Sequence, residues 1–398
     1  MLNFNLDIYI FKNTFSLYMN NKFILHNTII SVGDNSFSDL KEFLASSNPT
    51  KIFILVDQNT KKYCLPRILS LVSSLKSACV LELKGCAEHS GNIEVLKSMN
   101  MVNDICIKLL NYNIDRDSLI INLGGGVICD LGGFVASIIK RGVKFINIPT
   151  TLMAQVDAAI GGKVAVNLKN HKNQVGLFVD PVLIIVCPFF NRSISNFNFV
   201  CAFSEVLKYG LIYDLKFWKQ IVYDHDLVFK NQIIDQASDL TELISKCIQI
   251  KIEIVNSDYY DIGHRRKLNF GHSIAHAFES YVLEHVDLDG SGNAVHHGLA
   301  LSLGLVCETY ISYRKFNFPK MILNDIALKI EQIFPPIDYD LIKFKKLVIG
   351  YLKSDKKNLN GQYQFSLIKE IGQPIVNCSV SESEIIDSID YYINKMWK

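Results

Sequence analysis

Short runs of apolar residues alternate with amphipathic stretches over the first half of the chain. The apolar runs have the length and composition of buried strands. They occupy residues 51–57, 79–83, 119–123, 145–148 and 183–186. Between them, residues 90–111 and 126–139 have the length and hydrophobic periodicity of helices. Strands that alternate with helices predict βαβ units and a mostly parallel, Rossmann-like sheet.

The pattern changes near Phe199, and helical periodicity dominates the rest of the chain. It covers residues 204–222, 231–255, 272–284, 295–313, 321–333, 339–353 and 382–396. The sequence therefore predicts an α/β domain over residues 1–190 and a mainly α-helical domain over residues 191–398. A cleft between two domains is the usual place for a ligand. The first 45 residues are expected to supply edge strands to the sheet.

Composition narrows the class of protein. The chain has 398 residues, of which 49% are hydrophobic and 20% charged, as in a compact soluble protein. A net charge of +2 argues against a nucleic-acid surface, so a bound anion should meet a local cluster of cations. The ten cysteines include no CxxC pair, which predicts reduced thiols. With no signal peptide and no apolar run that could span a bilayer, we expect a cytoplasmic protein without a membrane partner.

The segment Asn269–His276, NFGHSIAH, is the strongest local signal. Its glycine ends one element, and a helix that begins near His272 places His272 and His276 one turn apart on one face. Two imidazoles at this spacing suit a divalent metal or a phosphate-bearing substrate. Six of the ten histidines lie within residues 264–297, and a cationic triplet, Arg265–Lys267, precedes the helix. Spacing alone thus makes both histidines candidate metal ligands.

A glycine-rich turn follows one of the predicted strands. Residues 119–130 read LIINLGGGVICD, an arrangement that lets backbone N–H groups approach a pyrophosphate at a helix N-terminus. Cys129 occupies the third glycine position of the dinucleotide fingerprint, so a purely structural tight turn is an equal alternative. Asp57, directly after another predicted strand, offers either a hydroxyl-binding acid or an ordinary strand-end turn.

Two further segments carry weaker signals. Residues 149–173 combine glycines, hydroxyl side chains, an aspartate and two lysines, which could hold the hydroxyls and a phosphate or carboxylate of a ligand, although lysines on loops are usually just solvated. Glu205 and Lys208 lie three residues apart on a predicted helix. Spacing alone favours a surface ion pair there over a metal-binding carboxylate beside a cation.

Eight segments together resemble the 3-dehydroquinate synthase family. In chain order they read VDQN, GGGVICDLGGFVAS, KRGVKFINIPTTLMAQVDAAIGGKVAVN, HKNQVGLF, SEVLKYGLI, RRKLNFGHSIAHAFES, HHGLA and SDKK. They lie between residues 51 and 370, and eight motifs in register are far more specific than any one of them. The resemblance implies an NAD-binding α/β domain, a helical domain that carries metal and substrate, and a homodimer.

The resemblance also implies a set of metal ligands, Glu205, His272 and His297, for Zn²⁺ or Co²⁺. This set replaces the pair suggested by spacing, because the family's second histidine serves the substrate, which moves His276 to the substrate set. His296 is the alternative to His297; the latter is preferred because the family's histidine directly precedes glycine. Two histidines and one carboxylate leave coordination positions open for substrate oxygens.

The family's remaining contacts fall on two groups of residues. The implied NAD contacts are Asp57, Asn59, Gly125, Gly126, Asp130, Thr150 and Thr151, with Phe190 and Ser193 as weaker members. The implied substrate contacts are Asp157, Lys163, Lys172, Asn173, Lys208, Lys251, Arg265, Asn269, His276 and Lys356, with Arg141 reaching across the dimer. This cationic set would let a near-neutral chain hold a substrate that bears both phosphate and carboxylate.

By resemblance, the chain is expected to convert 3-deoxy-D-arabino-heptulosonate 7-phosphate to 3-dehydroquinate and phosphate, a step of the shikimate pathway. NAD is reduced transiently and then regenerated, which makes the net reaction a lyase reaction.

Several positions depart from the family pattern. Gly91 stands where a nucleotide-contacting lysine is usual, and Leu299 replaces an acid beside a metal ligand. The segments Val186–Pro188 and Ser193–Ser195 also differ, and residues 284–295 are expected to form an extended loop. These departures could weaken NAD affinity or indicate a divergent substrate.

Three alternatives stay open at this point. One is another sugar-phosphate cyclase, which makes a valiolone or a deoxy-inosose; Arg265, Asn269 and His276 argue against it. Another is a metal-dependent polyol dehydrogenase of related fold, which would not need the LNFGH motif. The last is an inactive homologue, which the intact Glu205 and Lys208 disfavour.

Overall fold

The computed structural model describes residues 21–84, 93–168, 171–231, 237–285, 296–353 and 362–396. By its internal contacts the chain forms two compact units. Unit 1 comprises residues 1–194 and 231–256, and unit 2 comprises residues 195–230 and 257–398. The segment 231–256, which the sequence assigned to the helical domain, thus groups with the α/β unit.

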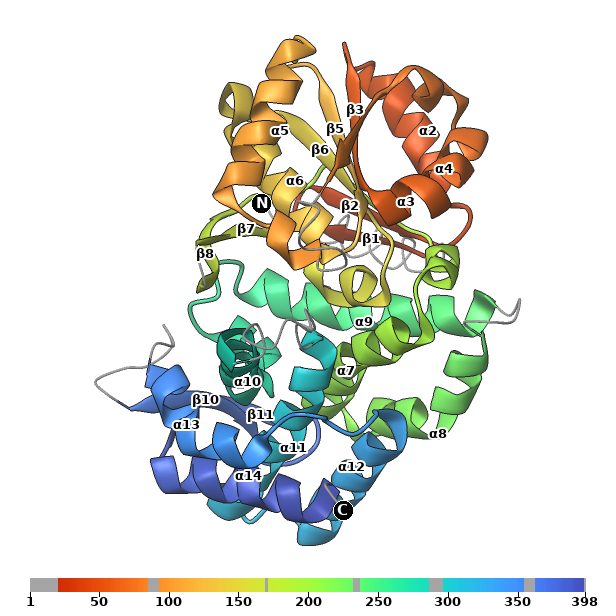
Figure 1. Cartoon of the computed structure of the whole chain (residues 1–398). Coiled ribbons are helices and arrows are strands. Elements are labelled where there is room, and N and C mark those ends of the chain that lie inside the picture. Colours follow the sequence, from red (N-terminus) through yellow and green to blue (C-terminus); the bar gives the residue numbers. More distant parts are fainter. Residues whose placement is uncertain are drawn as a thin grey trace, which may run out of the picture. The chain divides into compact units, whose positions relative to one another are not determined.

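Unit 1 is built on a seven-stranded sheet with the order β1-β2-β9-β6-β5-β3-β4 (Figure 1). Its strands are β1 Lys22–Leu25, β2 Thr28–Val32, β3 Ile52–Asp57, β4 Cys79–Leu83, β5 Leu119–Gly124, β6 Lys144–Pro149 and β9 Leu183–Val186. Only β1 and β2 pair antiparallel; the other neighbours are parallel. The predicted, mostly parallel sheet is confirmed. Each of the five predicted strands is observed, with both ends within one residue of the prediction. The early strand β1 lies at an edge of the sheet.

Helices and one hairpin complete the described part of unit 1. The helices are α2 Ser36–Ser47, α3 Gln58–Tyr63, α4 Leu65–Leu71, α5 Met99–Asn111, α6 Gly126–Ile138 and α9 Ala237–Ser257. One-turn segments are η1 Ser73–Ser77, η3 Ile93–Leu96, η4 Ile139–Arg141, η5 Ala154–Ala158 and η6 Pro188–Ser193. The antiparallel hairpin of β7 Lys163–Leu168 and β8 His171–Phe178 was not predicted. Helix α5 begins at Met99, so the predicted start at residue 90 was too early.

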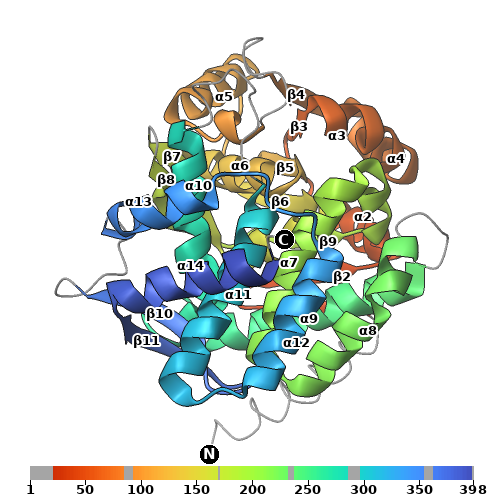
Figure 2. The ribbon, with the colours of Figure 1, turned by 60° about the horizontal axis from the view of Figure 1, so that its bottom comes forward.

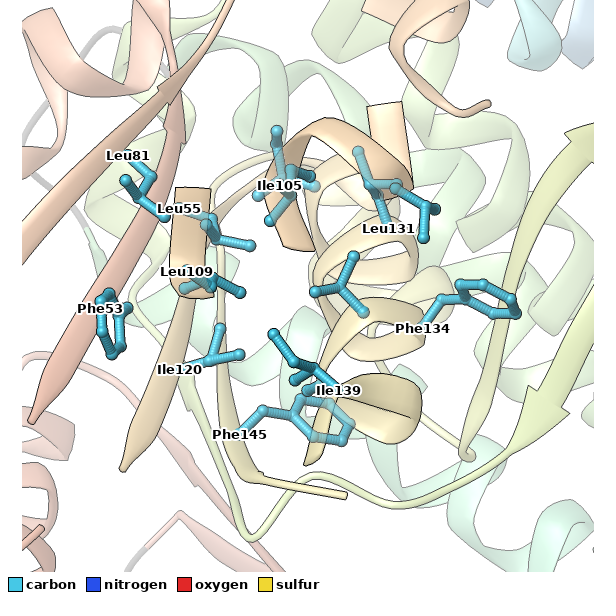
Figure 3. Close-up of a cluster of buried hydrophobic side chains, with 14 of the residues drawn as sticks. Phe53, Leu55, Leu81, Ile105, Leu109, Ile120, Leu131, Phe134, Ile139 and Phe145 are labelled. Carbon is cyan, nitrogen blue, oxygen red and sulfur yellow. The ribbon is translucent and has the colours of Figure 1, made fainter. Parts of the chain in front are cut away.

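The central strands of the sheet of unit 1 are buried on both faces. Successive side chains of a strand point to opposite faces, and on β3 Phe53 and Leu55 join one apolar cluster while Ile54 and Val56 join another. Figure 3 shows the first cluster, in which strand residues meet Ile105 of α5 and other helical side chains. Burying each such side chain stabilises the fold by about 1.5–3 kcal/mol. Burial on both faces explains why the strands are unbroken apolar runs in the sequence.

Unit 2 is mainly helical. Its helices are α7 Asn196–Tyr213, α8 Leu215–Asn231, α10 His272–His285, α11 His297–Phe316, α12 Lys320–Ile333, α13 Leu341–Lys353 and α14 Glu382–Met396, and η7 spans His264–Asn269. Strands β10 Tyr363–Ile368 and β11 Pro374–Val380 form an antiparallel pair. Helix α11 is buried along most of its length and packs against α7, α10, α12 and α14 (Figure 2). The predicted mainly helical domain is confirmed.

One predicted helix, residues 204–222, is wrong. The chain breaks at Asp214, whose Oδ1 accepts a hydrogen bond from the Phe217 N–H at 2.6 Å and so caps the N-terminus of α8. The helical period of the apolar residues continues across this cap, because α7 and α8 both bury an apolar face. The sequence pattern therefore predicted one helix where the structure has two. Within the described ranges, no helix is long and apolar enough to cross a membrane.

Candidate active site

Three side chains from three helices of unit 2 converge: Glu205 on α7, His272 on α10 and His297 on α11. Oε1 of Glu205 lies 3.5 Å from Nε2 of His272 and 3.3 Å from Nε2 of His297. All three potential ligand atoms lie within 4.8 Å of one another. Two imidazoles and a carboxylate at this separation can hold a Zn²⁺ or Co²⁺ ion with coordination positions left open. The structure thus brings the expected ligand set together, and its role in metal binding stays a prediction.

Glycines let these helices approach closely. A Cβ on Gly298, next to His297, would lie 1.8 Å from the backbone oxygen of Cys201 on α7. A Cβ on Gly304 would lie 1.8 Å from the backbone oxygen of Gly271, which itself has a φ of +83°. Side chains at these positions would push α7, α10 and α11 apart, so the glycines set the spacing of the ligands.

Each candidate ligand has a partner that fixes its orientation. Nδ1 of His297 lies 3.3 Å from Oε1 of Glu279, and Nδ1 of His272 lies 3.3 Å from the Phe270 carbonyl oxygen. Nζ of Lys208 lies 2.5 Å from Oε2 of Glu205, within the buried interior, so the expectation of a surface ion pair is wrong. Partners of this kind set the tautomer and the ring direction of metal-binding histidines.

Glu279 was missed by the sequence reasoning. A signal for it existed, because Glu279 lies three residues after His276 and seven after His272, on the same face of α10.

The electrostatics of the cluster favour positive charge. Burial by itself would raise the pKa of the Glu205 carboxyl, but Lys208 and hydrogen bonds from the two histidines hold it well below its ordinary range. Burial lowers the pKa of His272. Burial also opposes protonation of His297, yet the carboxylates of Glu279 and Glu205 raise its pKa to about 10. The carboxylates that stabilise a proton here would equally stabilise a divalent cation.

His276 lies beside this cluster and is exposed. Its ring centroid is 5.4 Å from that of His272 and 6.2 Å from that of His297. A second group of potential ligand atoms, from His276, Glu279 and His297, also lies within 4.8 Å. Glu205, His272 and His297 make the more enclosed group, which leaves the exposed imidazole of His276 better suited to substrate.

Other expected substrate contacts of unit 2 lie just before α10. Arg265 is buried on η7, where its Nη1 donates to the Tyr259 carbonyl oxygen at 2.7 Å. Asn269 is the last residue of η7. Lys356 lies outside the described residues. Glu308 of α11, which the sequence did not single out, accepts backbone N–H bonds from Gly271 at 2.6 Å, from Ser273 at 3.0 Å and from Ile274 at 3.2 Å. It therefore holds the first turn of α10.

The expected nucleotide contacts gather at the carboxyl ends of strands β3, β5 and β6. The β5–β6 register pairs Gly124 with Pro149, which brings the glycine turn beside Thr150 and Thr151. A Cβ on Gly125 would lie 3.2 Å from Thr151 Cγ2, and a Cβ on Gly126 would lie 3.1 Å from Ala158 Cβ. The absence of side chains opens the N-terminus of α6, a suitable place for a pyrophosphate.

The remaining expected nucleotide contacts have structural roles in the described residues. Asp57 caps α3, because its Oδ1 accepts from the N–H groups of Asn59 at 2.7 Å and Thr60 at 2.9 Å. Phe190 packs in the apolar core, and the hydroxyl of Ser193 donates to the Phe190 carbonyl oxygen at 2.7 Å. Their contact with NAD stays a prediction.

In unit 1, two lysines form ion pairs with residues expected to contact substrate or NAD. Nζ of Lys251, on α9, lies 2.5 Å from Oδ1 of Asp157. Nζ of Lys97, which the sequence did not single out, lies 2.5 Å from both Asp130 Oδ2 and Asn173 Oδ1. Burial raises the pKa of Asp130, and Lys97 opposes that rise.

Three more expected substrate contacts also lie in unit 1. Lys163 begins β7 and Lys172 lies on β8. Arg141 lies at the end of η4 with a φ of +65°, directly after Lys140 with a φ of +51°. Two consecutive left-handed residues store strain, and such strain concentrates at functional sites.

Comparison with solved structures shows which proteins share this fold. The chain superposes on 2-epi-5-epi-valiolone synthase from Streptomyces hygroscopicus subsp. jinggangensis, solved with NAD⁺ and Zn²⁺, with a TM-score of 0.77 and 18% identity over 94% of this chain and 98% of that one. It superposes on 2-deoxy-scyllo-inosose synthase, solved with carbaglucose-6-phosphate, NAD⁺ and Co²⁺, with a TM-score of 0.75 and 18% identity over 92% and 96% of the two chains. The chain shares the fold of these two synthases.

Comparison of the sequence with known families and proteins identifies the family of the chain. The family models described as 3-dehydroquinate synthase N-terminal and C-terminal match residues 89–200 and 202–358. The 3-dehydroquinate synthase of Parabacteroides distasonis is 34% identical over 356 residues, which cover 89% of this chain and 95% of that protein. The chain belongs to the 3-dehydroquinate synthase family.

Proposed function

We propose that this chain converts 3-deoxy-D-arabino-heptulosonate 7-phosphate to 3-dehydroquinate and phosphate, with transient reduction of NAD, in the shikimate pathway. The observation that carries the proposal is the convergence of Glu205, His272 and His297 beside Lys208 in a chain of this family. The curated relative in Parabacteroides distasonis bears this activity in its name.

Metal and nucleotide have separate places in this proposal. Glu205, His272 and His297 would hold Zn²⁺ or Co²⁺, which when bound supplies Lewis-acid polarisation of substrate oxygens. Gly125, Gly126 and the residues grouped with them would hold NAD, which when bound supplies a hydride acceptor that is later regenerated. The donor chemistry fits the metal, and the open N-terminus of α6 fits the diphosphate of NAD.

The chain's own residues bind and orient the substrate. Lys208 lies against Glu205, so its ammonium both lowers the carboxylate's proton affinity and adds positive charge where an oxyanion would develop. Arg265, Lys163, Lys172 and Lys251 offer the cations that a phosphate and a carboxylate require. The imidazole of His276 is exposed, and in this proposal it exchanges a proton with the substrate.

We also infer that the protein acts as a cytoplasmic homodimer in which Arg141 reaches the partner's substrate. The strained backbone at Lys140 and Arg141 supports a functional role for this turn. Analytical ultracentrifugation and an Arg141→Ala variant test the inference. The variant should remain dimeric and lose substrate affinity.

The first test is phosphate release from 3-deoxy-D-arabino-heptulosonate 7-phosphate with catalytic NAD⁺, before and after EDTA and after restoration with Zn²⁺ or Co²⁺. A coupled dehydroquinase reports the product. Metal-restorable turnover without net NADH supports the proposal. Binding of NAD⁺ and metal without phosphate release would redirect it to a different sugar phosphate, and binding of neither would favour an inactive homologue.

A further inference from the structure

Helix α11 carries one candidate metal ligand itself and holds the backbone around another. His297 is the first residue of α11, and Glu308 follows about three turns later on the same face of the helix. His272, the other candidate histidine, is the first residue of α10. The contacts of Glu308 therefore bear on how the two histidines are placed relative to each other.

The Glu308 side chain is fully buried and bonded to the backbone on both sides of His272. Its Oε2 accepts the N–H of Gly271 at 2.6 Å. Its Oε1 accepts the N–H groups of Ser273 at 3.0 Å and Ile274 at 3.2 Å. The first N–H groups of a helix have no partner within the helix, so this carboxylate takes the place of a cap from the chain before α10.

The same face of α11 confines this turn sterically. A Cβ on Gly304 would lie 1.8 Å from the backbone oxygen of Gly271, so the two backbones are in direct contact. A Cβ on Gly271, which has a φ of +83°, would lie 2.8 Å from Leu305 Cδ2 and 2.9 Å from Leu301 Cδ1. These three residues of α11 and Glu308 have the spacing i, i+3, i+4 and i+7, which places them on one helix face.

The bonding pattern requires a carboxylate. The three N–H groups are shared between both oxygens of Glu308, and an ionised carboxylate accepts at both. A glutamine amide has one acceptor oxygen and would turn its NH₂ group toward at least one of the N–H donors. An aspartate keeps both oxygens but is one methylene shorter, so it cannot reach them without movement of the backbone.

We propose that Glu308 is a positioning residue that fixes the His272 turn along α11 and so sets the spacing between His272 and His297. The inference rests on the proposed function, because it takes both histidines as metal ligands. Zn²⁺ holds histidine nitrogens at about 2.0–2.1 Å, so a displaced His272 turn weakens the ligand set. Glu308 acts through backbone N–H groups rather than through an imidazole.

The test uses two variants, Glu308→Gln and Glu308→Asp. Competition with a chromophoric chelator measures Zn²⁺ affinity, and the visible absorption spectrum of the Co²⁺-loaded protein reports the coordination geometry. Both variants should bind Zn²⁺ about ten-fold more weakly, as for loss of other residues that orient metal ligands. Both should also change the Co²⁺ spectrum. Glu308→Asp keeps the charge, so it separates position from electrostatic attraction and carries the test if Glu308→Gln does not fold.

Thr309→Val is the matched control, at the next residue of the same buried helix. Thr309 is also fully buried, and its Oγ1 donates to the Leu305 carbonyl oxygen at 2.6 Å. Loss of this hydroxyl should lower the melting temperature but leave the Zn²⁺ affinity and the Co²⁺ spectrum as in wild type. This control shows whether a general loss of stability is enough to alter the metal site.

The outcomes separate the inference from the proposed function. Wild-type affinity and spectrum in Glu308→Asp, or changes in Thr309→Val as large as those in the Glu308 variants, would overturn the positioning role. In either case the metal site of the wild type would stand. Wild-type protein that binds neither Zn²⁺ nor Co²⁺ would overturn the proposed metal site, and the inference with it.

Discussion

The buried carboxylate of Glu279 contacts the imidazole of His297. We expect this contact to affect the metal affinity of the proposed site. We expect Glu279→Gln to lower Zn²⁺ affinity by roughly 10- to 100-fold, because the partner of a metal-binding histidine sets its tautomer and basicity. Competition with a chromophoric chelator measures the affinity. Glu370→Gln, at an exposed glutamate of the same unit, is the control and should leave the affinity unchanged. Equal affinities in wild type and Glu279→Gln would show that the contact has no such role.

Asp258 organises the loop that carries Arg265. Its Oδ2 accepts the N–H groups of Gly263 at 2.8 Å and Arg265 at 3.0 Å, and its Oδ1 accepts that of Ile262 at 3.1 Å. Burial would raise the pKa of this carboxyl, but these bonds and the charge of Arg265 lower it below its ordinary value. A lowered pKa means that the stabilisation is present above the ordinary value and is lost as pH falls through the lowered one.

The corresponding variant is Asp258→Asn. It should raise the substrate KM by roughly ten-fold, as expected for loss of bonds to a charged acceptor. Below about pH 4, its free energy of unfolding should fall less steeply with pH than that of wild type. Urea titrations at several pH values measure this slope, with Asp387→Asn, at a carboxylate 48% exposed, as the control. Parallel slopes for all three proteins would contradict the assignment.

The site could be predicted from sequence only where a local motif carried it. Glu205, His272 and His297 could be identified because each lies within a contiguous segment that resembles the family. Lys97 was not, because its partner Asn173 is 76 residues away and no local pattern distinguishes a buried lysine from a solvated one. Glu308 was not identified for the same reason, because its backbone partner Gly271, at the start of α10, lies 37 residues earlier in the chain.

Among the elements, α11 packs closely at Gly304 against Gly271, the residue before α10. Gly304→Ala would bring a Cβ to 1.8 Å from the Gly271 oxygen, so the helices must separate. We expect a loss of about 3 kcal/mol or more in the free energy of unfolding, together with weaker metal binding. Gly350→Ala on α13 is the matched control, because a Cβ there meets nothing within 4 Å. It should stabilise by about 0.5–1 kcal/mol, as expected for replacing glycine in a helix. Denaturant unfolding measures both, and a harmless Gly304→Ala would refute the packing argument.

Secondary structure was predictable wherever burial imposed a clear period. Strand β9 matches its predicted range because all four of its residues are apolar and buried. Strand β4 also matches its range, although Glu82 interrupts its apolar run. The break at Asp214 was not predicted, because one capping side chain interrupts two helices that share an apolar period. The β7–β8 hairpin was also missed, since its half-exposed strands lack the unbroken apolar runs of the main sheet.

For the whole molecule, the proposed metal site predicts a free energy of unfolding that depends on the concentration of the cation. The three candidate ligands come from three separate helices, so a bound ion should tie α7, α10 and α11 together. A ligand at 1,000 times its dissociation constant stabilises the folded state by about 4 kcal/mol. After EDTA treatment, added Zn²⁺ should raise the melting temperature of wild type by several degrees and leave His297→Ala unchanged. Differential scanning calorimetry measures the shift, and an equal shift in both proteins would place the ion elsewhere.

The grouping of residues 231–256 with unit 1 has a consequence for how the chain is made. Unit 1 is discontinuous, because the chain leaves it at residue 194 and returns at residue 231. During synthesis, Asp157 emerges from the ribosome long before Lys251, its ion-pair partner on α9. The N-terminal unit therefore cannot be completed as soon as its own sheet has been translated, and a fragment that ends at residue 194 would lack a helix that belongs to it. The segments of the two units alternate along the chain, so we expect unit 1 to complete its fold only after the first segment of unit 2 has been made.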